Sequence, residues 1–168
     1  MTLHAGREPD RPTIDAEPRI LPLAAVRPNS VRAIVDHLVE RESAVHAAVR
    51  VSLDGGGEGQ EIDVDSTVVR DLLEPLVAAA SANAAGPAAE TDGPALREVD
   101  VAVVATADGL EVEIADSGPD QPFGARVPPH VRDAAARCGA EVTLSPCAAG
   151  GTAVTVRLPR RGARRQAA

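Results

Sequence analysis

The stretch that most constrains the fold is a strand that ends abruptly at a carboxylate. Leu110, Val112 and Ile114 alternate with less apolar residues in the period of a half-buried strand. The apolar alternation then stops at Asp116, and Gly118 follows two positions later. Turns after strands use the same residue types for backbone reasons, so an Asp-x-Gly triplet by itself favours a turn over a ligand site.

The composition restricts both the core and the partners. The chain has 168 residues, is 44% hydrophobic and contains one Phe but no Trp or Tyr, so its core must be built from Val, Leu, Ile and Ala. Stacking of aromatic side chains on bases is therefore almost ruled out. Without the four arginines that follow Pro159, 25 acidic residues face 13 basic ones, a charge of −12. Such a body should repel nucleic acid and anionic membranes.

The cysteine and histidine content favours a reducing compartment without a structural metal. Only Cys138 and Cys147 are present, and the chain does not start with a secretory segment, so we expect a cytoplasmic protein. No apolar run approaches the length of a membrane span. The four histidines share no ligand spacing with the cysteines, which argues against a structural zinc site.

The first half of the chain predicts helix, hairpin and helix. Apolar residues from Val31 onward repeat at helical spacing, with Asn29 or Ser30 placed to cap the first turn. A strand over 49–53, a glycine-rich turn and a short strand over 61–64 are typical of a hairpin. The glycines lack the Gly-Lys-Ser/Thr ending of a phosphate loop. A second helix follows Asp65 or Ser66 and contains Pro75, which predicts a kink near residues 70–71.

The second half continues this alternation with a hairpin, a helix and a final pair of strands. A hairpin is predicted over 100–115, and Pro128 and Pro129 open a third helix that ends at Gly139. The last strands are expected at 141–144 and 153–158. The order predicts a mixed sheet with helices on one face, a two-layer α/β sandwich. We expect a mobile arm over 1–20, a domain over 21–159 and a basic tail over 160–168.

The order of elements and three stretches carry a family resemblance. These stretches are IADSGPD, GAEVTLSPCAAGGTAVTVRLP and VSLDGGGEGQEIDVDSTVVRDLLEPLVAAASANAA. Together they resemble the ATP-binding catalytic domain of histidine kinases, the Bergerat (GHKL) fold, over roughly residues 21–159. Leu21-Pro22-Leu23, the helix from Val31 and the third of these stretches resemble the region by which chemotaxis-type histidine kinases enter this domain. The resemblance implies a role in two-component signal transduction.

The resemblance also implies an adenine site. In the family, the Asp that ends the middle strand accepts a hydrogen bond from the adenine amino group, and Asp116 matches it, with Gly118 letting the backbone approach the ring. Thr152, after Gly150 and Gly151, resembles the threonine that helps to hold this carboxylate. A hairpin turn also explains the two glycines, and the two interpretations are compatible. A carboxylate facing an amine discriminates adenine from guanine, whose carbonyl would leave it unpaired.

The residues expected to hold the phosphates and the metal ion depart from the family pattern. The resemblance implies that Asn83 ligates Mg²⁺, but counting from Pro75 in the chemotaxis-type register places Ala82 there, and one residue is about 100° of helix rotation. Asp120 replaces a family glycine and adds negative charge near the phosphates. Gly124 is the only candidate for the phosphate-holding glycines of the lid.

Two hypotheses remain. In the first hypothesis, the chain is an enzyme module. It binds ATP and Mg²⁺ through Asn83, Asp116, Gly118 and Thr152 and supports phosphoryl transfer to a histidine on another protein. Alternatively, it is a degenerate module that keeps the fold and the adenine pocket and acts by binding a signalling protein. The sequence predicts weak binding of adenine nucleotide with little or no turnover.

Overall fold

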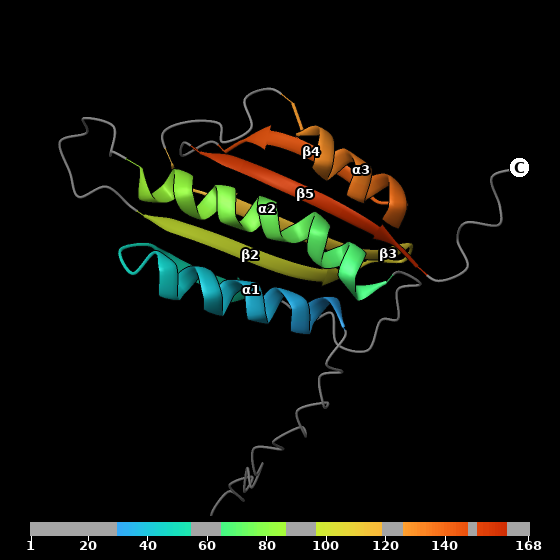
Figure 1. The fold of residues 1–168 in the computed structure, drawn as a ribbon, viewed down its shortest axis with the longest axis horizontal. Helices are drawn as coiled ribbons and strands as arrows, with labels where there is room; N and C mark the ends of the chain where they lie inside the picture. The colour runs from blue at the N-terminus through green and yellow to red at the C-terminus, as the bar shows by residue number, and fades with distance from the viewer. Residues whose placement is uncertain (1–29, 55–64, 87–96, 119–125, 148–150, 161–168) are drawn as a thin grey trace, which may run out of the picture.

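The helices and strands follow one another in the predicted order. The computed structural model describes residues 30–54, 65–86, 97–118, 126–147 and 151–160. The helices are α1 (Val31–Val45), α2 (Ser66–Ala85) and α3 (Pro129–Cys138). The strands are β1 (Arg50–Asp54), β2 (Glu98–Ala105), β3 (Gly109–Asp116), β4 (Glu141–Pro146) and β5 (Thr152–Pro159). Figure 1 shows the helices lying over one sheet and running roughly along its strands.

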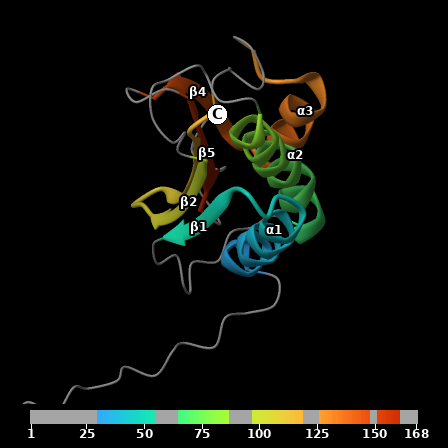
Figure 2. The same cartoon turned by 90° about the vertical axis from the view of Figure 1, so that its left-hand side faces the viewer.

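The described strands form a mixed sheet in the order β1-β2-β3-β5-β4. The β1–β2 pair is parallel, and the other three pairs are antiparallel. Viewed from the side, the three helices lie together on one face of the sheet (Figure 2). The predicted two-layer α/β sandwich is therefore confirmed, with α2 packed between α1 and α3 over the central strands.

The core lies between the two layers and is aliphatic, as the composition required. Even-numbered residues of β3 and β5 point toward the helices and are buried, as are Val99, Val101 and Val103 of β2. The largest fully buried side chains include Leu38, Leu72, Leu73, Leu76, Leu110, Ile114 and Leu158. The opposite sheet face carries Glu111, Glu113 and other polar residues, as expected for a largely antiparallel sheet with one solvated face.

Helix ends are formed by the residues that the sequence suggested. The Ser30 side chain accepts a hydrogen bond from Ala33 N (3.1 Å), and the Asp65 side chain accepts one from Thr67 N (2.7 Å). Gly139 closes α3 in the left-handed conformation at φ 65°. Pro75 lies inside α2, where its ring nitrogen cannot donate to the carbonyl of Asp71.

We expect Ser30→Ala to lower the free energy of unfolding by about 1 kcal/mol, because the first turn of α1 loses a capping acceptor. Urea denaturation measures the change. Ser43→Ala is the matched control: this hydroxyl donates to Val39 O on the exposed side of the same helix, and its removal should be nearly neutral. Equal losses for the two variants would contradict the capping role.

Some predictions lie outside the described residues. They are the arm over 1–20, the strand over 61–64 with its glycine-rich turn, and the tail beyond Arg160. The described partner of β1 is β2, more than 40 residues later in the chain. Arg160 is still tied to the sheet, because its N–H donates to Asp108 O (2.7 Å). Among the described helices, none is both long and apolar enough to span a bilayer.

Candidate functional site

The carboxylate of Asp116 is buried at the end of β3. The alternation that buries Leu110, Val112 and Ile114 continues for one more step and turns Asp116 toward the helix layer, where it is only 4% exposed. A carboxylate in the core is costly unless it is hydrogen-bonded, so its partners define what the site can do.

One carboxylate oxygen of Asp116 is occupied and the other is not. Oδ1 accepts hydrogen bonds from Asn83 Nδ2 (2.6 Å) and from the backbone N–H of Gly118 (2.8 Å). Oδ2 is buried and has no hydrogen-bond partner among the described residues. The site therefore presents a buried acceptor that a ligand N–H group could satisfy.

Burial raises the pKa of Asp116 above its ordinary value of 3.8, because the charged form is desolvated. The hydrogen bonds from Gly118 and Asn83 oppose this shift in the pKa, as does the backbone N–H of Thr152, which faces the carboxyl group without reaching hydrogen-bond geometry with Oδ2. A ligand that donates to Oδ2 would stabilise the charged form in the same way.

Two glycines allow the backbone to approach this carboxylate closely. A Cβ atom on Gly118 would overlap the carboxamide of Asn83 and lie 2.7 Å from its backbone carbon. Gly151 has φ +84°, and a Cβ atom there would overlap the carbonyl oxygen of Asp116 and lie 3.1 Å from Oδ1. Side chains at either position would therefore displace Asp116 or the helix that holds Asn83.

Two further buried hydroxyls have no hydrogen-bond partner among the described residues. They are Oγ1 of Thr152, which is 3% exposed, and Oγ of Ser81. The sequence analysis selected Thr152 but overlooked Ser81. Ser81 lies four residues after Val77 and three before Ala84, so the apolar stripe of α2 could have predicted a buried hydroxyl there.

The structure brings most of the described candidate residues together. Asn83 and Gly118 bond directly to Asp116, Gly151 packs against it, and the Thr152 N–H faces it. Of the two residues that the alternative helix registers place at the family's Asn position, Asn83 reaches the site and Ala82 is exposed. Gly124, Gly150 and Asp120 lie outside the described residues, so their predicted roles remain predictions.

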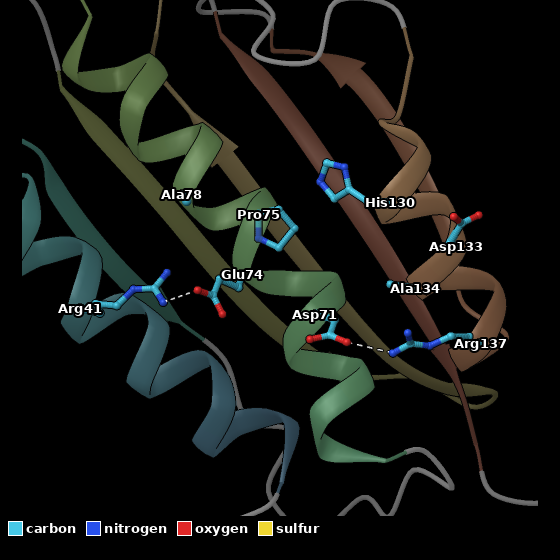
Figure 3. Close-up of a pocket in the computed structure, with 9 residues that line it drawn as sticks. All are labelled: Arg41, Asp71, Glu74, Pro75, Ala78, His130, Asp133, Ala134 and Arg137. Atoms are coloured by element: carbon cyan, nitrogen blue, oxygen red, sulfur yellow. Dashed lines mark hydrogen bonds and ion pairs between the residues drawn. The ribbon is translucent and has the colours of Figure 1, made fainter.

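A groove on the outer side of the helix layer is a separate feature (Figure 3). It has a volume of about 700 Å³ and is lined by residues of all three helices. Two ion pairs border it, the partly buried Arg41–Glu74 (2.6 Å) and the exposed Arg137–Asp71 (2.9 Å), and they connect α2 to its two neighbours. None of its lining residues is among the buried side chains that lack a hydrogen-bond partner, so we assign no ligand to it.

Comparison with known proteins shows which solved structures have a similar fold. No protein-family model matches the chain, and no curated protein matches it by sequence. Among solved structures, the ATP-binding domain of PrrB from Mycobacterium tuberculosis is 18% identical with a TM-score of 0.60 and covers 76% of this chain and 92% of that one. The catalytic domain of histidine kinase ThkA is 12% identical with a TM-score of 0.56, and the match covers 75% of this chain and 93% of that one.

A longer protein gives a similar match over part of its length. Full-length ShkA, solved in complex with AMPPNP, is 18% identical with a TM-score of 0.58, and the match covers 81% of this chain but 31% of ShkA. The chain thus spans nearly all of the isolated domains and about a third of the larger protein. Identities this low show the fold, which is that of histidine kinase ATP-binding domains, as the sequence resemblance predicted.

Proposed function

We propose that this chain, which has the fold of histidine kinase ATP-binding domains, binds adenine nucleotide in bacterial signal transduction, with weak or absent phosphotransfer. The observation that carries the proposal is the buried carboxylate of Asp116 with its unpartnered Oδ2. The proposed partners are the nucleotide and a signalling protein, and the −12 charge of the body argues against nucleic acid or an anionic membrane surface.

The geometry of the carboxylate supports adenine in particular. The adenine amino group can donate to Oδ2, whereas guanine would place a carbonyl oxygen against a buried acceptor. Sites that hydrogen-bond one group reject an analogue that lacks it far more strongly than apolar pockets do. Gly118 and Gly151 let the chain pack closely on Asn83 and Asp116, and the Thr152 hydroxyl offers a further polar group to a ligand.

Phosphotransfer is the less supported half of the activity. Transfer of a phosphoryl group depends on positioning and on stabilisation of negative charge by cations and N–H groups. By the family resemblance, Asp120, where the family has glycine, would add negative charge near the phosphates. Non-catalytic action through a signalling partner is therefore the second candidate function.

The test is Asp116→Asn, assayed by calorimetry with ADP. The variant keeps the shape and the Oδ1 acceptor but can turn an N–H₂ group toward the adenine amino group, so we expect at least about a tenfold loss of affinity with the fold retained. Asp54→Asn is the matched control, because Asp54 also ends a strand but is exposed. If Asp116→Asn binds ADP as well as the parent chain, the adenine assignment is wrong.

A further inference from the structure

We infer that Asn83 is a positioning residue that orients Asp116 toward adenine and is not a ligand for Mg²⁺, so that the site recognises the adenosine part of a nucleotide without a divalent cation. This inference rests on the proposed adenine site and adds which part of the nucleotide is recognised. It also departs from the role that the family resemblance implies for this asparagine.

Asn83 is fixed against Asp116 from two sides. Its Nδ2 donates to Asp116 Oδ1 at 2.6 Å, a bond that joins the last turn of α2 to the end of β3. The backbone of Gly118 packs so closely on the carboxamide that no side chain fits between them. Gly118 also donates its N–H to the same oxygen. With Oδ1 held by two donors, the carboxylate can present only Oδ2 to a ligand.

The hydrogen bond to Asp116 makes Asn83 a poor ligand for a nucleotide-bound cation. A cation on its carboxamide would lie beside the carboxylate that holds the adenine amino group. In an extended nucleotide the purine, the ribose and the α-phosphate separate the β- and γ-phosphates from that amino group, which places them away from such a cation. Mg²⁺ also requires near-octahedral oxygen ligands, usually from one or two carboxylates together with phosphates.

The neighbouring residues do not supply an alternative metal site. Ala82, which occupies the metal position in the chemotaxis-type register, is exposed and ends in a methyl group. Within the described part of the chain, no three His, Cys, Asp or Glu side chains gather in a way that could hold a metal ion. The residues described around Asp116 therefore fit an adenine base and do not fit Mg²⁺.

The first experiment is calorimetry of the full chain with adenosine, ADP and ATP, each in EDTA and in excess Mg²⁺. We expect the three affinities to agree within about threefold and to be insensitive to Mg²⁺. A rise of about tenfold or more in ATP affinity with Mg²⁺ would overturn the inference and leave the adenine site standing. If the parent chain binds none of the three ligands, the proposed function fails, and the inference fails with it.

The second experiment needs no ligand and reports the positioning role directly. In Asn83→Ala, the charged form of Asp116 loses a hydrogen-bond donor, so the pKa of Asp116 should rise further, as followed by the carboxyl ¹³C shift during a pH titration. Ala82→Gln, at the exposed neighbouring position, is the control and should leave that pKa unchanged. If Asn83→Ala does not fold, Asn83→Ser serves instead and should give a smaller shift in the same direction. An unchanged pKa in the Asn83 variant would disprove the positioning role.

Discussion

Asn83→Asp is expected to lower the free energy of unfolding by about 2–4 kcal/mol at pH 8, although it changes only one atom of the side chain. The substitution replaces a donor 2.6 Å from the buried Asp116 carboxylate with a second carboxylate oxygen. Two carboxylates in contact cannot both ionise, so the folded state must either retain a proton or separate the groups.

The pH dependence of this variant has a defined sign. Burial already raises the pKa of Asp116, and a second carboxylate raises the folded-state pKa of the pair further, while the unfolded residues titrate near their ordinary values of about 4. The folded state then binds more protons than the unfolded state. Stability is therefore greatest at low pH and is lost as pH rises through the folded-state pKa.

The measurement is urea denaturation of parent and variant at pH 5 and pH 8, where the gap between the two proteins should be larger at pH 8. The double variant Asn83→Asp with Asp116→Asn provides the control, because it restores one carboxylate and one amide in contact. We expect it to recover most of the lost stability but not ADP binding, since the carboxylate is then on the helix. A gap that does not depend on pH would show that the two side chains do not interact as described.

Gly151→Ala is also expected to lower the free energy of unfolding by about 2–4 kcal/mol. Two physical effects add up. Alanine at φ +84° is strained, and its Cβ atom would overlap the Asp116 carbonyl oxygen and lie 2.7 Å from the carbonyl carbon. Because the overlap is with backbone rather than with a flexible side chain, β3 and β5 must separate locally. We therefore expect ADP binding to fall as well.

Thermal and urea denaturation of Gly151→Ala would measure this loss. Gly86→Ala is the control glycine substitution. Gly86 follows α2, its φ is −57°, and the nearest atom to a Cβ there is Asn83 O at 3.0 Å. Alanine at that position should cost much less than at Gly151. If the two alanine variants are equally stable, the close approach of Gly151 to Asp116 is not a constraint on the fold.

Much of this architecture could be read from local patterns. The alternation of Leu110, Val112 and Ile114 predicted both strand β3 and the side of it that is buried. The helical stripe around Leu72, Leu73 and Leu76 predicted α2 and its core face. These predictions hold because periodicity depends on neighbouring residues and on a single apolar core. The pairing of β1 with β2 could not be found this way, since the two strands lie more than 40 residues apart.

By itself, the sequence determined the order of elements, the aliphatic core and the presence of an acid at the end of β3. Only the tertiary structure decided what that acid meets. Asn83 and Asp116 are 33 residues apart, and one residue of helix rotation separates a carboxamide on the carboxylate from an exposed methyl group. That contact depends on how α2 packs across the sheet, which local periodicity does not specify to within one residue.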